Sequence, residues 1–350
     1  MRAVRVKAVL ATVVAGGLLV GCSSTDGGDS AEKEDGSRNA VIGSSESGGP
    51  SAAPSTLAEG MGADQATDGT FPRTVTHFKG ATTLKTEPRK IAVLSTGQLD
   101  DLLSLGLVPT ATTRADNAGL VPDYLADAFP EDKAELADMT DAGTRQAPNL
   151  ESLAAAKPDL ILANDSLGDL YPKLSKIAPT VITAGNGINW KRDLLLVGAA
   201  VGKGQQAREL LDDIVADAEE KGAALDTDPT VSMVRFTPDR TRMFGVSSFT
   251  GSIAVDMGLE RPESQRFNAI SEDIGPESVD TADGDWIFYS VQGDAKETDA
   301  ASVVAGPLWK SMKAVEAGHA VKVDDDPWYL NAGPTAARLV VRQLAGHIGE

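Results

Sequence analysis

The chain has 350 residues, of which 41% are hydrophobic, so it is long enough and apolar enough to form globular cores. Acidic residues outnumber basic ones, and the formal net charge is -19 at pH 7. A surface this acidic is repelled by phosphate backbones, which argues against nucleic acid as a partner.

Residues 1–21 have the pattern of a signal peptide. Three cations, Arg2, Arg5 and Lys7, precede an apolar run that is too short for a relaxed membrane span. The run ends in Leu-Val-Gly followed by Cys22, which resembles the lipobox of bacterial lipoproteins, where the cysteine is lipidated and becomes the new N-terminus. Cys22 is the single cysteine of the chain, which excludes an intramolecular disulfide. We therefore expect Cys22 to anchor the protein on the extracellular face of the cell membrane.

Residues 22–70 are predicted to form a disordered tether. Ser, Gly, Ala, Asp and Glu dominate the segment and its apolar residues show no period, so it cannot bury enough surface to offset chain entropy. A flexible coil of this length has an r.m.s. span of roughly 40 Å, which would hold a folded body near the membrane.

Folded sequence is expected to begin near Phe71, and residues 71–186 are predicted to form a first lobe. Short apolar runs alternate there with helical patterns, which is typical of βα units around a mostly parallel sheet. The predicted strands are Ile91–Leu94, Thr110–Thr113, Leu160–Ala163 and Val181–Thr183, and the predicted helices include Gln98–Leu105 and Leu150–Ala156.

Two consecutive helices are predicted in the linking segment, residues 187–227. The first, Asn189–Val201, ends before Gly202, which suits a helix C-terminus. The second, Gln205–Leu225, has apolar residues at steps of three and four. A helix of this length measures about 30 Å, which is enough to link two lobes.

A second βα series is predicted over residues 228–350. Its predicted strands are Thr230–Phe236, Arg242–Phe244, Trp286–Tyr289 and Ala320–Val323, and its helical patterns fall at Gly251–Met257, Pro307–Met312 and Thr335–Ile348. The predicted fold class is therefore α/β, with two Rossmann-like α/β lobes joined by a single long helix.

A series of short motifs occurs in order along residues 71–348. The motifs are Phe71–Val75, Pro88–Leu94, Leu105–Pro109, Asn149–Glu151, Lys157–Leu162, Leu174–Thr180, Gly258–Pro262, Asp285–Phe288, Pro307–Trp309 and Gly333–Ala337. Each is weak alone, but the ordered set resembles the iron-siderophore substrate-binding proteins of ABC importers, a family that also includes cobalamin and haem binders. The resemblance implies a class III periplasmic-binding-protein fold, acting as a monomer, with the ligand held between two lobes and delivered to a permease dimer.

The same resemblance assigns a docking role to one glutamate on each lobe. Glu151 lies in the Asn-x-Glu motif, and Glu277 precedes the Asp-Trp-Ile-Phe strand by the spacing that the family shows. Two exposed carboxylates set far apart can align a partner that carries matching cations. Both could instead be helix-start acids that favour the positive end of the helix dipole, and Glu272 is a rival for the second role.

Five residues are candidate ligand contacts. Arg235, near the end of a predicted strand, offers forked donors to hydroxamate or carboxylate oxygens, or forms an ion pair. An aromatic residue in a polar loop can stack on a chelate or serve local packing. The candidates of that kind are Trp190, Trp328, Tyr329 and Phe249.

The predicted function is that of a binding protein for a ferric siderophore, with ferric hydroxamate as the leading ligand. Haem and cobalamin remain alternatives, and the four tyrosines keep a haem axial ligand open. The three histidines are not spaced as metal ligands, so iron is expected to arrive already chelated, with no cofactor bound directly. The sequence has no nucleophile elbow, zinc-protease motif or phosphate-binding loop, which argues against an enzyme. A sensor or adhesion protein with the same fold is not distinguished.

Overall fold

The N-terminal lobe (N-lobe) is built on a parallel sheet, as predicted. The computed structural model of the chain describes residues 53–115 and 118–349. The strands lie in the order β6-β5-β4-β7-β8, and every neighbouring pair is parallel. They are β4 (Ile91–Val93), β5 (Ala111–Arg114), β6 (Thr140–Thr144), β7 (Leu160–Asn164) and β8 (Thr180–Thr183), with helices α1 (Gln98–Ser104), α2 (Asp123–Ala128), α3 (Lys133–Ala137), α4 (Leu150–Ala155) and α5 (Tyr171–Ile177). Because both faces of such a sheet are covered, β4 and β7 are continuous apolar runs in the sequence.

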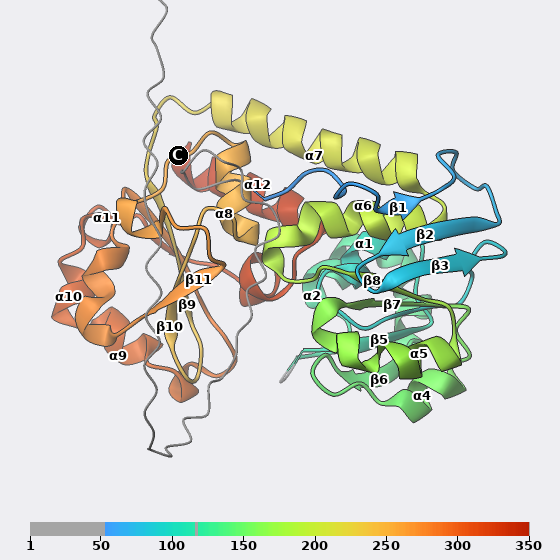
Figure 1. Ribbon diagram of the computed structural model, residues 1–350. Coiled ribbons are helices and arrows are strands. Elements are labelled where there is room, and N and C mark those ends of the chain that lie inside the picture. The colour runs from blue at the N-terminus through green and yellow to red at the C-terminus, as the bar shows by residue number, and fades with distance from the viewer. Residues whose placement is uncertain (1–52, 116–117, 350) are drawn as a thin grey trace, which may run out of the picture. The chain divides into compact units, whose positions relative to one another are not determined.

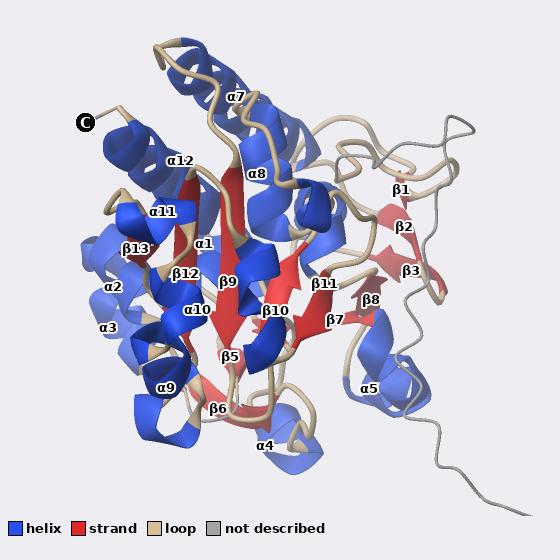
Figure 2. Cartoon of the chain, turned by 90° about the vertical axis from the view of Figure 1, so that its left-hand side faces the viewer, coloured by secondary structure: helices blue, strands red, loops and turns tan. Residues whose placement is uncertain are grey.

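The C-terminal lobe (C-lobe) has a mixed sheet in the order β11-β10-β9-β12-β13, seen in Figure 2 behind α9 and α10. Its elements are β9 (Val231–Phe236), β10 (Thr241–Phe244), β11 (Ser271–Ile274), β12 (Trp286–Val291), β13 (Ala320–Lys322), α8 (Phe249–Asp256), α9 (Ala300–Ala305), α10 (Pro307–Lys310), α11 (Lys313–Glu316) and α12 (Pro334–Ile348). β10 is antiparallel to both β9 and β11. A tight turn, closed by a hydrogen bond from Thr237 N–H to Arg240 O, joins β9 to β10 and is too short for a parallel crossover.

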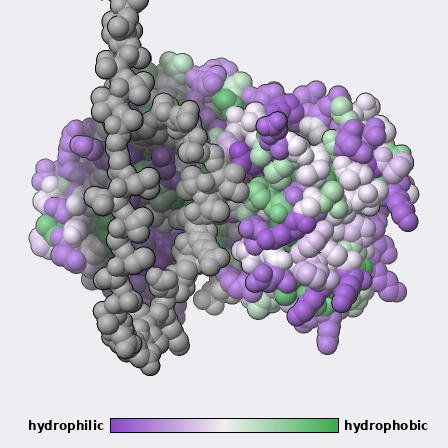
Figure 3. All heavy atoms as spheres, in the orientation of Figure 1, coloured by the Kyte–Doolittle hydropathy of each residue, from purple (hydrophilic) through white to green (hydrophobic). Residues whose placement is uncertain are grey.

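A long helix connects the two lobes. After α6 (Trp190–Val201), α7 (Gly204–Ala223) packs against both α6 and the C-terminal helix α12 (Figure 1). Its buried stripe is Ala207, Leu211, Ile214 and Ala218, and its outer face is mostly hydrophilic (Figure 3). The predicted helix Gln205–Leu225 and the two-lobed α/β fold class are thereby confirmed. Within the described residues, no helix is both long and apolar enough to cross a membrane.

The segment 53–70 belongs to the folded body, so the prediction of a tether that extends to residue 70 is wrong for these residues. Ala53 is buried, and Arg208 and Arg192 donate hydrogen bonds to the carbonyls of Ser55 (2.9 Å) and Thr56 (3.2 Å). Composition could not reveal this, because the two arginines lie more than a hundred residues away in the sequence. The remaining part of the predicted tether, 22–52, lies outside the described residues.

A small antiparallel sheet continues from this segment and contains a buried histidine. Its strands are β1 (Gly62–Ala63), β2 (Arg73–His77) and β3 (Gly80–Leu84). The Thr82 hydroxyl donates to Thr180 O, so it accepts from His77 Nε2, while His77 Nδ1 accepts from the Lys79 N–H. The imidazole is therefore neutral, and burial lowers the pKa of His77 to about 4.

A buried carboxylate ties the N-lobe to helix α12. Asp100 of α1 accepts hydrogen bonds from the N–H groups of Thr335 (2.9 Å) and Ala336 (3.0 Å), which are orphan donors at the start of α12. Gly97, with φ of 84°, precedes α1, and a Cβ there would lie 2.1 Å from Ala332 O. Only glycine suits both the left-handed backbone and this close approach.

Candidate ligand-binding cleft

Two adjoining cavities lie between the lobes, at the carboxyl ends of the parallel strands. Their volumes are ≈ 440 Å³ and ≈ 650 Å³, and Gln292 and Leu330 line both. The N-lobe residues that line the first cavity lie at or just after the ends of β4, β5, β6 and β7. The C-lobe residues that line the second cavity lie at or just after the ends of β9, β12 and β13. Open α/β sheets hold their ligands at this edge. We call the two cavities together the cleft, and its volume suits a small molecule or a metal chelate.

The N-lobe half of the cleft, the ≈ 440 Å³ cavity, has a polar and mostly neutral lining. Its hydroxyl, amide and guanidinium side chains are Ser95, Thr96, Gln146, Asn164, Ser166, Gln292 and Arg145. Arg145 is the only charged residue among the described residues that line this cavity. The arrangement offers hydrogen bonds to an oxygen-rich ligand together with one positive charge.

Arg145 follows β6 and is shared between the cleft and the contact between the lobes. Its two terminal nitrogens donate to Asn331 Oδ1 (2.5 Å) and Leu330 O (3.3 Å). Its Nε is buried and has no hydrogen-bond partner among the described residues. Burial lowers the pKa of Arg145, against the opposing effects of Tyr124 and Asp326. A buried donor without a partner is unfavourable, so this guanidinium is suited to donate a further hydrogen bond to an acceptor on a ligand.

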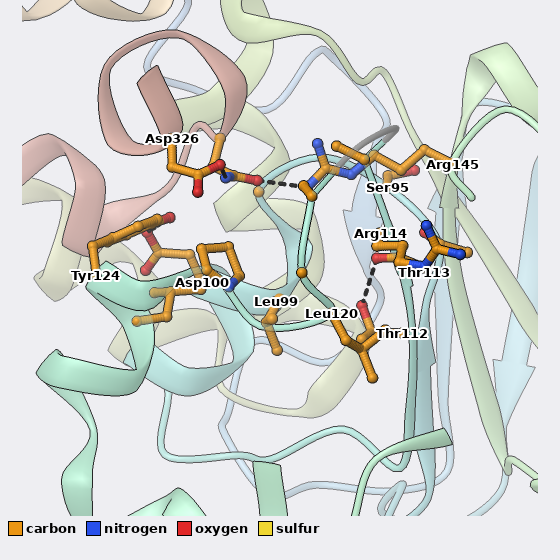
Figure 4. A pocket seen from close by; sticks show the side chains of 17 residues that line it. Ser95, Leu99, Asp100, Thr112, Thr113, Arg114, Leu120, Tyr124, Arg145 and Asp326 are labelled. Atoms are coloured by element: carbon orange, nitrogen blue, oxygen red, sulfur yellow. Dashed lines mark hydrogen bonds between the residues drawn. The ribbon is translucent and has the colours of Figure 1, made fainter. Parts of the chain in front are cut away.

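A smaller pocket lies beside Arg145, with a volume of ≈ 10 Å³, room for about one water molecule (Figure 4). The Tyr124 hydroxyl donates to Asp100 Oδ2 (3.3 Å), and burial together with Asp100 raises the pKa of Tyr124. Burial, and then the neighbouring aspartates, raise the pKa of Asp326. The pocket is too small for a ligand. It is lined both by Arg145 and by Asp100, whose carboxylate accepts hydrogen bonds from the start of α12.

The C-lobe half, the ≈ 650 Å³ cavity, is lined by acidic side chains. Its charged lining residues are Asp294, Glu297, Asp324, Asp325, Asp326 and Lys322. Asp325 is neutralised by Arg235, whose Nε and terminal nitrogen lie 2.8 and 2.6 Å from its carboxylate oxygens, and Ser290 donates to the same carboxylate. The two halves of the cleft therefore differ in charge.

Arg235, predicted either to contact the ligand or to form an ion pair, is paired in the structure, and its contact with a ligand stays a prediction. All six residues of β9 are buried, so a charged residue on this strand requires a partner. Asp325 is that partner, and the ion pair is the alternative that the sequence left open.

Three of the four aromatic candidates are buried and Tyr329 is half-buried, and none lines the described part of the cleft. The rings of Trp190 and Phe249 meet edge to face at 5.3 Å, and both side chains are buried. Trp328 has an exposed fraction of 0% and stacks on Phe288 at 5.0 Å. The Tyr329 hydroxyl donates to Phe288 O (2.7 Å). These contacts agree with local packing, the alternative that the sequence left open, and a ligand contact by any of the four rings stays a prediction.

Glu151 and Glu277 are both exposed, as surface docking would require. Glu151 lies in the first turn of α4, where Asn149 provides the cap, and Glu277 lies in the 3₁₀ segment Pro276–Ala282. Neither forms an ion pair with a described residue. The rival Glu272 is exposed on β11. The predicted lipidation site, Cys22, lies outside the described residues.

Residues 53–115 and 118–349 contain no group of three or more His, Cys, Asp or Glu that could hold a metal ion. The residues that do line the cleft include Arg145, Asn164, Ser166 and Gln292, none of which the sequence analysis identified. A usable signal existed for Asn164 and Ser166, because Asn164 directly follows a predicted strand and Ser166 comes two residues later. Arg145 lacked that signal, because β6 was not predicted.

Comparison with known proteins places the chain in a family. The model of a periplasmic binding protein family matches residues 91–327. The chain belongs to this periplasmic binding protein family. The family consists of substrate-binding proteins, and the resemblance identified from the sequence motifs is confirmed.

Individual relatives agree over most of the chain. The chain is 32% identical over 290 residues to the probable siderophore-binding lipoprotein YfiY of Bacillus subtilis (strain 168), covering 78% of this chain and 86% of that protein. It is 26% identical over 277 residues to the Fe(3+) dicitrate-binding periplasmic protein FecB of Escherichia coli (strain K12), covering 77% and 88%. Among solved structures, Staphylococcus aureus SirA complexed with staphyloferrin B is 28% identical, with a TM-score of 0.69, covering 79% of this chain and 98% of SirA.

Proposed function

We propose that this protein captures a ferric siderophore in the cleft and delivers it to an ABC permease. The observation that carries the proposal is the pair of cavities at the carboxyl ends of the strands, between two lobes of a periplasmic binding protein. Relatives named for a siderophore, for Fe(3+) dicitrate and for staphyloferrin B support iron chelates as the ligand class. The protein binds its ligand without turnover.

Within that class, a hydroxamate complex is the ligand that we favour. Three hydroxamates neutralise Fe³⁺, so the complex presents oxygen acceptors with little net charge. The N-lobe half of the cleft is complementary to such a surface, since amide and hydroxyl donors surround the single cation Arg145. Arg145 is the residue that we assign to the chelate oxygens, because its fork of donors matches paired oxygen acceptors.

Haem is a weaker candidate. A haem iron held by the protein needs an axial ligand, commonly histidine or tyrosine. No histidine or tyrosine is among the described residues that line either cavity of the cleft. Cobalamin has no comparable objection and is distinguished by the binding experiment below.

The remaining assignments concern how the protein is held and how it meets the permease. We assign lipidation to Cys22, which places the folded body outside the cell membrane on the segment that precedes residue 53. We assign permease docking to Glu151 and Glu277, which are exposed and free of described ion pairs. The protein is proposed to act as a monomer.

Intrinsic tryptophan fluorescence tests the proposed ligand. Trp190 and Trp328 are buried, so a ferric complex in the cleft quenches them by energy transfer rather than by contact. Titration with a panel of ferric siderophores, haem and cobalamin should show saturable quenching by ferric siderophores, with the iron-free siderophores as controls. Saturable binding of haem or cobalamin alone, or no saturation with any ferric siderophore, would overturn the proposal.

A further inference from the structure

The unequal charge of the two halves of the cleft restricts the ligand beyond its class. Five acidic side chains and one lysine line the C-lobe half, whereas Arg145 is the only charged residue lining the described N-lobe half. Arg235 neutralises one of the five acids, Asp325. Arg145 lies near a second, Asp326. Three acids, Asp294, Glu297 and Asp324, remain.

These three carboxylates have no compensating cation among the residues that the structure describes. All three are exposed on the C-lobe wall, and none forms an ion pair with a described residue. Lys322, the one base among the described residues of this wall, is also exposed and also forms no described ion pair. The wall therefore keeps an excess of negative charge that faces the cavity.

Such a wall acts differently on ligands of different charge. Like charges brought together at an interface are unfavourable, and opposite charges favour both encounter and register. A strongly anionic chelate would meet three carboxylates with only Arg145 and Lys322 in compensation. A protonated amine on an arm of the ligand would instead supply the cation that the wall lacks.

We infer that the cleft selects ferric complexes of zero or positive net charge, with the iron core on the Arg145 side and a cationic amine arm against Asp294, Glu297 and Asp324. The inference rests on the proposed function and deepens it. It follows from the acids on one wall together with the partnerless donor of Arg145 in the other half.

Three probes with the same iron core separate charge from shape. Ferric desferrioxamine B has a free terminal amine and carries one positive charge, its N-acetyl derivative is neutral, and its N-succinyl derivative carries one negative charge. We expect affinity to fall in that order, by about tenfold per unit of charge at low salt, and the differences to shrink at high ionic strength because exposed charges are screened.

A triple variant, Asp294→Asn with Glu297→Gln and Asp324→Asn, should reduce the difference between the amine and succinyl probes to about threefold or less. The matched control, Glu209→Gln with Asp212→Asn and Asp213→Asn, removes the same charge from exposed positions on α7, and it should leave the order unchanged.

The outcomes separate this inference from the proposed function. Equal affinities for all three probes, or tightest binding of the succinyl derivative, overturn the charge selection while leaving siderophore capture in place. An equal loss of discrimination in the control variant also overturns it, because net charge rather than the wall would then be responsible. If neither these probes nor any other ferric siderophore binds, both proposals fall.

Discussion

The buried carboxylate of Asp100 should contribute a large part of the stability of the contact between the N-lobe and α12. It accepts four hydrogen bonds, from the N–H groups of Thr335 and Ala336 and from the hydroxyls of Ser104 and Tyr124. Asp100→Ala leaves the two helix donors without a partner in a buried site. A lost N-cap typically costs about 1 kcal/mol, and an unsatisfied buried donor about 1–3 kcal/mol. We therefore expect a loss of about 3 kcal/mol in the free energy of unfolding.

The neighbouring Asp101 provides a matched control. It is equally buried, but its Oδ1 has no hydrogen-bond partner, and burial, Asp100 and Asp193 raise its pKa. Asp101→Ala removes a carboxyl group that makes no described hydrogen bond, so the free energy of unfolding should be unchanged within about 1 kcal/mol or should rise. Urea unfolding at pH 7 measures both variants. Equal losses for Asp100→Ala and Asp101→Ala would refute the assignment of the capping role.

Three further predictions concern the ligand, pH and uptake. Arg145→Ala should weaken ferric siderophore binding by about 10–100-fold, the equivalent of one charge-assisted hydrogen bond. Arg242→Ala, which removes a surface ion pair, should leave the affinity unchanged. Equal losses of affinity in the two variants would exclude Arg145 from the site. The pKa of His77 in the folded state, about 4, lies below its unfolded value of about 6.5, so the unfolded state binds a proton more readily. The free energy of unfolding should therefore fall by about 2–3 kcal/mol as pH drops from about 6.5 toward 4. An imidazole NMR resonance titrating near 6.5 would contradict this. Glu151→Ala combined with Glu277→Ala should reduce uptake into cells while leaving affinity for the siderophore intact, and unchanged uptake would remove the docking role.

The sequence predicted the fold well, because the fold depends on local patterns. Alternating apolar runs and helical periods located most strands of both sheets, and the steps of three and four along Gln205–Leu225 located α7 within two residues. β11 was missed because Ser-Glu-Asp-Ile has no apolar pattern of its own. It forms an edge strand by pairing with β10, a contact that single-sequence periodicity does not contain.

The site was predicted less well, because its residues are defined by contacts between distant segments. Trp328 follows three aspartates, which made a polar loop the natural interpretation, but a single π-helical turn carries its ring onto Phe288. Arg235 is separated by 90 residues from the aspartate that neutralises it. Arg145 could be recognised as a cleft residue only once β6 had been placed beside β5.

The central claim is that the cleft between the lobes holds a ferric complex. A crystal structure of the protein grown with a ferric siderophore, with the iron located by its anomalous scattering, tests this claim most directly. We expect one iron position inside the cleft, with Arg145 on the N-lobe side and Gln292 on the C-lobe side. An iron position elsewhere on the protein, with the cleft vacant at saturating ligand, would contradict it.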